Sequence, residues 1–232
     1  MRHVVIAAQR VLADTRRTHW RRLRQPIISD WLAKGDVRRL HLGAGATGMR
    51  GWLNTDLDPR RGGSNFVFLD VTEPFPFPDA SVDLIFCEHM IEHIGYADGV
   101  GMLGECWRVL KPGGALRVST PDLAVLAALY NGPPSEMQES YVRYIVDQSM
   151  PGCTDYAPAF VVNSAFHAWG PRFLYDEAIL RGALQRAGFC DVTRHAMGES
   201  SIADFRGVES HGKQAGHYPM AEFESMVFEA RR

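Results

Sequence analysis

The stretch from Arg38 to Pro59 constrains the fold of this chain more than any other part of its sequence. It reads RRLHLGAGATGMRGWLNTDLDP: an apolar run, a glycine-rich turn, and a second apolar run that ends on an acidic residue. Glycine permits a tight turn and lets the backbone approach a ligand closely. We therefore expect two buried strands joined by a turn that contacts a ligand.

The spacing between the glycines and the acidic residue separates two kinds of cofactor. A dinucleotide-binding loop needs a full helix between its glycines and its ribose-binding acid, which places that acid about twenty residues on. Here Asp56 follows Gly43 by thirteen positions, and residues 46–51 are too few for such a helix. The segment GAGATG therefore has the glycine spacing of the dinucleotide-binding motif but lacks the helix that the motif requires. Asp56 is placed to bind the ribose of another cofactor or, alternatively, to cap the turn.

The rest of the chain alternates predicted strands with helices. Apolar runs predict further strands over residues 65–68, 81–86, 115–119, 191–195 and 224–230. Helical spacing predicts helices over 98–110 and 176–187. This alternation is typical of a doubly wound α/β fold with a mostly parallel sheet.

Residues 1–35 form an N-terminal helical arm in this interpretation, and residues 36–232 form the main domain. The arm carries eight Lys or Arg residues against Asp14 and Asp30. Apolar residues at helical spacing predict an amphipathic helix that Pro26 interrupts, followed by a short helix over 27–33. We expect a packing arm with solvated arginines; a lid, a contact with an acidic partner and a transit peptide are the alternatives.

Composition excludes several classes of protein. The 232 residues, 46% of them hydrophobic, suffice for one domain with a real core, and a net charge of −2 gives no overall attraction to nucleic acid. Four cysteines without CxxC spacing favour neither a zinc knuckle nor a disulfide framework. A reducing cytoplasm is therefore the expected compartment. No apolar run approaches the ~18 residues of a membrane span. A homodimer is left open.

Four stretches together resemble the class I S-adenosylmethionine-dependent methyltransferases. They are LHLGAGATGMRGWLNTDLDP, FLDVTEPFPFPDASVDLIFCEHMIEHI, ECWRVLKPGGALRVSTPDL and AWGPRFLYDEAILRGALQRAGF. The chain is similar in particular to methyltransferase-11-like bacterial proteins with an LNLG...GWLNVDL opening, which are often associated with polysaccharide or secondary-metabolite pathways. The resemblance implies a seven-stranded Rossmann-like sheet whose last strand is antiparallel. It also implies S-adenosylmethionine as cofactor and a small-molecule acceptor. We expect the acceptor group to be a hydroxyl of a sugar, glycoconjugate or secondary metabolite.

The resemblance also assigns cofactor-binding residues by position. The glycine turn, with Gly43, Ala44 and Gly45, would contact the methionine moiety, and Asp56 and Leu57 the ribose. Asp70 and Val71 would contact the adenine. Glu88 and His89 would lie near the sulfonium. The connector after Gly45 is shorter than in the family. We expect the N-terminal arm to buttress the glycine turn in its place.

Histidines are the natural candidates for removing a proton from the acceptor, because their pKa lies near neutrality. His89 and His93 are expected to share one face of a helix after the fourth strand, and His167 to approach from the segment 131–172. Residues 89–93 also spell HxxEH, a zinc-peptidase motif. Its position inside a cofactor-binding frame argues against a peptidase.

Two other functions stay open: a metal-assisted enzyme that uses the HxxEH motif, and a binding module without catalysis. Some relatives, among them ubiquinone-pathway O-methyltransferases and small-RNA 2'-O-methyltransferases, carry ExxEH here and bind a divalent metal. By that resemblance His89, Glu92 and His93 would bind a metal with His167, although a metal-free site is the expected case. A non-catalytic module that binds S-adenosylmethionine is the second alternative.

The segment 131–172 has a weak pattern, and we expect it to cover the substrate site. It gathers aromatic and polar residues that could orient a sugar or ring: Tyr141, Tyr144, Tyr156, Phe160, Asn163, Phe166, Trp169 and Arg172. Ordinary packing of an inserted helix pair is the competing interpretation.

Overall fold

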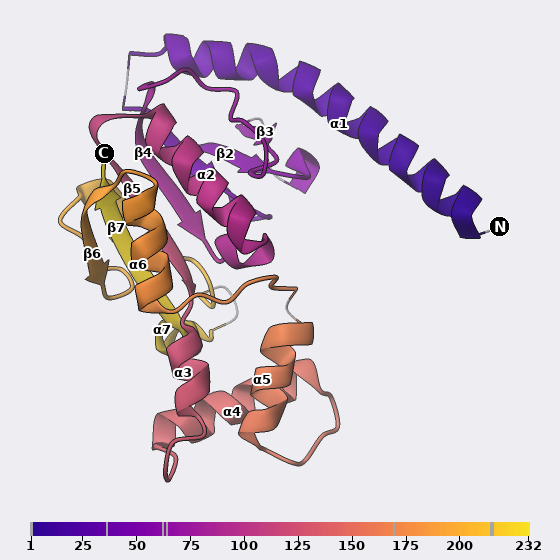
Figure 1. The fold of residues 1–232 in the computed structure, drawn as a ribbon, viewed down its shortest axis with the longest axis vertical. Helices are drawn as coiled ribbons and strands as arrows, with labels where there is room; N and C mark the ends of the chain where they lie inside the picture. Colours follow the sequence, from indigo (N-terminus) through magenta and orange to yellow (C-terminus); the bar gives the residue numbers. More distant parts are fainter. Residues whose placement is uncertain (1, 36, 62, 64, 169, 214–215) are drawn as a thin grey trace.

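A seven-stranded sheet forms the centre of the molecule in the computed structural model, which describes residues 2–35, 37–61, 63, 65–168, 170–213 and 216–232 (Figure 1). Its strand order is β3-β2-β1-β4-β5-β7-β6. The strands are β1 Arg39–Leu42, β2 Leu53–Asp56, β3 Phe66–Phe68, β4 Val82–Glu88, β5 Leu110–Pro121, β6 Cys190–His195 and β7 Ser225–Arg231. Strands β1 to β5 pair in parallel, and β7 runs antiparallel to both β5 and β6. The predicted fold class, including the antiparallel last strand, is confirmed.

Helices cover the sheet and extend beyond both of its ends. They are α1 Arg2–Ala33, η1 Pro59–Arg61, η2 Ile91–His93, α2 Tyr96–Val109, α3 Leu123–Ala128, α4 Glu136–Ser149, α5 Pro158–His167, α6 Glu177–Arg186, η3 Ala203–Phe205 and α7 Tyr218–Glu224. Helices α2 and α6 lie side by side on one face of the sheet (Figure 1). None of the described helices is both long and apolar enough to cross a bilayer.

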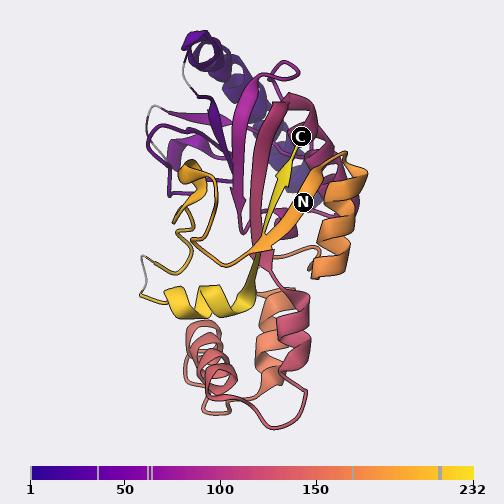
Figure 2. The same cartoon turned by 90° about the vertical axis from the view of Figure 1, so that its left-hand side faces the viewer.

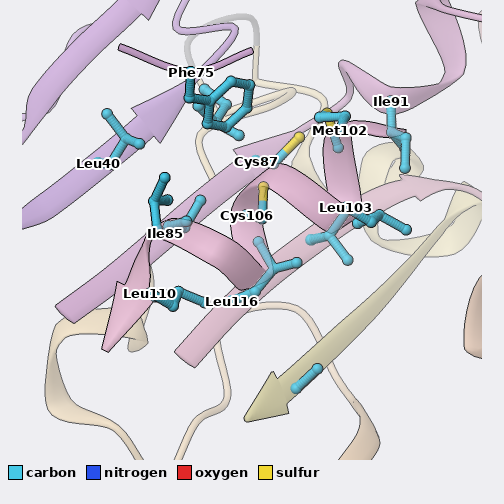
Figure 3. Packing of buried hydrophobic residues seen from close by; sticks show 14 of the residues in the cluster. Leu40, Phe75, Ile85, Cys87, Ile91, Met102, Leu103, Cys106, Leu110 and Leu116 are labelled. Carbon is cyan, nitrogen blue, oxygen red and sulfur yellow. The ribbon is translucent and has the colours of Figure 1, made fainter. Parts of the chain in front are cut away.

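The main core lies between the sheet and α2. Leu40, Ile85 and Leu116 project from three neighbouring strands toward Met102, Leu103 and Cys106 of α2 (Figure 3). The free thiols of Cys87 and Cys106 are fully buried in this cluster. Because burial raises the pKa of the Cys87 thiol, both cysteines act as small apolar side chains here.

The N-terminal arm is one continuous helix, so the predicted interruption at Pro26 is wrong. A proline inside a helix removes one backbone hydrogen bond, at a cost of about 3 kcal/mol. Pro26 lies on an exposed side of α1, where water can solvate the freed carbonyl group. The following turn is held in place because Ile28, 2% exposed, and Trp31 pack on the main core. Tertiary packing therefore outweighs the local preference of proline.

The weakly patterned segment 131–172 contains two helices, α4 and α5, as the competing interpretation proposed. Ser135 and Gln138 form a reciprocal capping box that starts α4, and Pro158 occupies the first turn of α5. These helices share an apolar cluster with α3 and α7, apart from the main core. Figure 2 shows this helical layer beyond the end of the sheet.

Candidate functional site

A cavity of about 580 Å³ lies at the edge of the sheet where the parallel strands β1, β4 and β5 end. This edge is where open α/β sheets bind ligands. Helix α4 and the end of α7 cover the cavity from the side of the helical layer. Its lining comprises His41, Gly43, Ala44, Gly45, Thr47, Glu88, His89, Glu92, His93, Pro121, Tyr144, Ile145, Gln148, Ser149, Pro171, Leu174, Ser210, His211, Gly212 and Glu224.

The glycine turn forms one wall of this cavity. Gly43 has φ +65°, and a Cβ atom there would lie 2.3 Å from the Met90 Cγ atom. Only glycine fits this position, because a side chain would need both an unfavourable backbone conformation and the space that Met90 fills. The turn therefore presents bare backbone to the cavity.

Polar side chains of β2 buttress the turn. The Asp56 carboxylate accepts the Gly45 N–H at 3.0 Å and the Asp58 N–H at 2.8 Å, one on each oxygen. The Asn54 side chain accepts the Met49 N–H at 2.8 Å and donates to the Met49 carbonyl at 3.1 Å. The expectation that the N-terminal arm replaces the missing helix is therefore wrong; β2 does so. Asp56 has the turn role given as its alternative, and each of its oxygens can still accept a second donor.

None of the expected ribose and adenine residues, Asp56 included, is among the residues that line the cavity. Leu57 is exposed, and Val71 packs against the main core. The Asp70 carboxylate accepts from the N–H and hydroxyl of Thr72, at 3.1 and 2.7 Å, and lies 3.6 Å from the Arg17 guanidinium of α1. The arm thus reaches the sheet edge where adenine is expected.

Two of the three candidate histidines, His89 and His93, come together at the cavity, and His167 lies apart from them. Residues 91–93 form a single 3-10 turn, and His89 precedes it with φ +44°, so the predicted shared face of His89 and His93 is wrong. Both rings instead approach one oxygen of Glu92, His89 Nδ1 at 3.5 Å and His93 Nε2 at 4.0 Å. His167 ends α5, is exposed and does not line the cavity.

Two buried carboxylates face the cavity. Glu92 is 3% exposed and accepts the Thr120 hydroxyl at 3.0 Å, and Glu224 accepts the Tyr141 hydroxyl at 2.5 Å. Burial raises the pKa of each carboxyl to about 7, since it penalises the charged form. Burial, with the adjacent His211, lowers the pKa of His89 well below its usual range. Within the described part of the chain, no lysine or arginine lines the cavity.

A loop after β6 closes the cavity and supplies residues that the sequence patterns did not indicate. The Glu88 carboxylate accepts the backbone N–H groups of Ser210 and His211 at 2.9 to 3.0 Å. The His211 ring stacks on His89 with centroids 4.0 Å apart, and its Nε2 lies 3.7 Å from Glu224 Oε1. In the sequence, the only indication of this contribution was a glutamate and a histidine in the polar run ESHG, which was predicted to be a polar connector.

A buried ion-pair network fixes the same loop to the sheet. Arg117 of β5 donates to Glu209 of the loop and to Glu229 of β7, each at 2.5 Å. Arg117 and Glu209 are fully buried, so neither charge has water as an alternative partner. The network therefore determines where Ser210 and His211 lie.

The aromatic cluster predicted to bind the acceptor is mostly structural. Tyr144 lines the cavity, whereas Tyr156 and Phe166 are exposed and Phe160 packs within the helical layer. The Asn163 side chain donates to the Ala159 carbonyl, and the Arg172 backbone N–H donates to the Glu92 carbonyl at 2.7 Å. Trp169 lies outside the described residues.

The fold and the ligand-binding edge define a class I, Rossmann-like methyltransferase architecture. A methyltransferase from Mesorhizobium loti superposes with a TM-score of 0.52 at 16% identity, covering 90% of this chain and 97% of the other. One from Archaeoglobus fulgidus superposes with a TM-score of 0.51 at 16% identity, covering 93% of each chain. Both are described as S-adenosylmethionine-dependent.

Sequence comparison agrees with the architecture. The model of the methyltransferase domain family matches residues 44–118. A probable S-adenosylmethionine-dependent methyltransferase of Mycolicibacterium smegmatis is 49% identical over 47 residues, which are 20% of this chain and 18% of that protein. An uncharacterized protein of a Streptomyces fradiae transposon is 34% identical over 73 residues, 32% of this chain and 20% of that protein. The matched segments thus span about a fifth of these two relatives. The fold is that of the class I S-adenosylmethionine-dependent methyltransferases, and the family match over residues 44–118 supports the same class.

Proposed function

We propose that this protein transfers a methyl group from S-adenosylmethionine to a hydroxyl of a small molecule, such as a sugar, glycoconjugate or secondary metabolite. One observation carries the proposal: a single cavity joins the bare backbone of the glycine turn to His93 and the buried Glu92. Donor and acceptor groups would therefore meet in one cavity, and holding two reactants together is a main source of rate acceleration.

The donor end has residues that fit S-adenosylmethionine, which supplies an activated methyl group when bound. The turn at Gly43 admits close approach of a ligand, and the two Asp56 oxygens keep acceptor capacity for a ribose diol. In this proposal Gly43, Ala44 and Gly45 hold the methionine moiety, Asp56 and Leu57 the ribose, and Asp70 and Val71 the adenine. Glu88 and His89 flank the reacting centre.

The acceptor end favours an uncharged substrate. Carboxylates and imidazoles line it, and among the described lining residues there is no cation to bind a phosphate or carboxylate. Tyr144 and Ile145 of α4 add an aromatic ring and an apolar surface suited to a sugar ring. In this proposal His93 accepts the proton of the acceptor hydroxyl, and its Nε2 atom lies 4.0 Å from Glu92 Oε1.

Calorimetry with S-adenosylhomocysteine, followed by a cofactor-consumption screen against sugars and phenols, tests this function. We expect saturable binding and turnover of at least one neutral hydroxyl compound. Failure to bind S-adenosylhomocysteine would refute the enzyme. Binding without turnover of any acceptor would favour the non-catalytic module.

A metal-assisted reaction is the second candidate function. The ligand set taken from the HxxEH motif is incomplete in the structure, because His167 does not line the cavity that holds His89, Glu92 and His93. His211 and Glu224 instead supply ligand atoms that lie within 4.8 Å of that of His89.

The cellular setting belongs to the same proposal. Cys153 and Cys190 are free and lie outside the fully buried core, which supports a reducing compartment such as the cytoplasm. Cell fractionation tests the location. Light scattering of the purified protein tests whether it forms the homodimer that the sequence leaves open.

A further inference from the structure

His89, His211 and Glu224 gather three metal-binding side chains on one side of the cavity. Each offers a ligand atom, and these atoms all lie within 4.8 Å of one another. The three come from separate parts of the chain: the connector after β4, the loop after η3, and the end of α7. Only His89 belongs to the HxxEH motif.

Each of two ligands has a partner that fixes its orientation. The Nδ1 atom of His89 faces Glu92 Oε1 at 3.5 Å, so its Nε2 points elsewhere and contacts the Ser225 hydroxyl at 2.8 Å. The Tyr141 hydroxyl binds Glu224 Oε2, which leaves Oε1 facing His211 Nε2 at 3.7 Å. Carboxylate–histidine pairs and hydrogen-bonded carboxylates of this kind orient the ligands of protein metal sites.

We infer that His89, His211 and Glu224 bind a divalent transition metal ion, with Zn²⁺ as the best match. Two imidazoles and one carboxylate form the donor set of a catalytic zinc site, in which a fourth position stays open to water or substrate. Nitrogen donors disfavour Mg²⁺ and Ca²⁺, which prefer oxygen. Carboxylates line the cavity, and none of its described lining residues is a lysine or arginine, so its charge also suits a cation.

The stacked rings must move apart to bind one ion. The His89 and His211 rings are nearly parallel, 13° apart, and a common ion must lie in the plane of both. The His211 side chain is 48% exposed, so it has room to rotate toward Glu224. If the proposed methyl transfer holds, an ion here would lower the pKa of a nearby acceptor hydroxyl. Ion binding itself does not depend on that function.

Cobalt spectroscopy and zinc calorimetry test the site on the purified full chain without a polyhistidine tag. We expect Co²⁺ to give the strong visible absorption of a four-coordinate site, Zn²⁺ to displace it, and Mg²⁺ to have no effect. His211→Ala and Glu224→Gln should each weaken Zn²⁺ binding at least about tenfold. His93→Ala is the matched control and should bind Zn²⁺ as the parent protein does.

Two outcomes would overturn the inference. One is a parent protein that binds Zn²⁺ no more tightly than His211→Ala; the other is loss of binding in His93→Ala with retention in His211→Ala, which would assign the ion to the HxxEH motif. Thermal melting without metal checks that each variant folds. If Glu224→Gln does not fold, His211→Ala still tests the site. S-adenosylhomocysteine binding, measured separately, distinguishes failure of this site from failure of the proposed function.

Discussion

Asp56 supports the glycine turn, and one substitution tests whether it also binds the ribose as proposed. Asp56→Ala should weaken S-adenosylhomocysteine binding at least about tenfold, because it removes charged acceptors for the ribose and the support of the Gly45 N–H. Calorimetry measures the loss. Asp58→Ala, which breaks a surface pair with Arg60, is the matched control and should keep its affinity. Unchanged affinity in Asp56→Ala would leave Asp56 with the turn role alone.

His93 provides the residue-level test of proton removal. His93→Ala should lower kcat by about a hundredfold or more, the usual contribution of a general base, while S-adenosylhomocysteine binding stays unchanged. Steady-state kinetics with the acceptor found in the screen measures the effect. An unaltered kcat and pH–rate profile would reject His93 as the base.

His41 makes stability depend on pH. Burial lowers the pKa of His41 to about 4 in the folded protein, against the ordinary histidine value of 6.5. The unfolded chain therefore binds more protons between these values, and stability falls as the pH drops through this window. Linkage predicts that about 2 kcal/mol of unfolding free energy is lost between pH 8 and pH 5.

Urea unfolding at both pH values, with His41→Gln as comparison, isolates this contribution. The glutamine can still hydrogen-bond Asn54, which His41 Nδ1 meets at 3.1 Å, but it does not titrate. We expect the variant to lose about 2 kcal/mol less than the parent protein over this range. Equal losses would show that His41 is not the group responsible.

Sequence patterns identified only some of the residues in and around the cavity. The glycine turn and the acid at the end of β2 that supports it could be predicted, because strand ends and glycines leave local signals. His211 and Glu224 could not, because they meet His89 only after the loop has folded back onto β4 through Glu88. Convergence of three distant segments leaves no spacing to detect in one sequence.

At the scale of elements, substitutions in helix α1 test whether the N-terminal arm contributes to the stability of the main domain. Ile28→Ala should lower the unfolding free energy by about 2 to 4 kcal/mol, because Ile28 lies in the main core. Leu23→Ala, on the same helix but 46% exposed, should change it by less than about 0.5 kcal/mol. Denaturant unfolding measures both. Equal small effects would mean that the arm detaches before the domain unfolds.

The elements also show where local patterns mislead. Most strands of the sheet could be predicted within a few residues because they alternate with helices and are strongly apolar. Helix α1 continues through Pro26, and α4 and α5 replace an expected irregular segment, because packing on neighbouring elements determines both. Their apolar faces have partners that are distant in sequence.

For the molecule as a whole, Arg117 joins two strands to the loop that closes the cavity. Arg117→Met should lower the unfolding free energy by about 3 to 5 kcal/mol, because Glu209 and Glu229 would remain buried without their cation. Chemical unfolding gives the free energy. Limited proteolysis should show earlier cleavage within residues 199–213. Normal stability with an intact loop would contradict the role assigned to this network.

The place of β7 in the sheet has a consequence for synthesis on the ribosome. Strand β7 lies between β5 and β6, although it follows both in the chain. A nascent chain therefore exposes an unpaired edge of β5, and β6 has no partner in the sheet, until β7 leaves the exit tunnel. Unpaired edges promote aggregation, so production of this protein should depend on chaperones that protect the first five strands during translation.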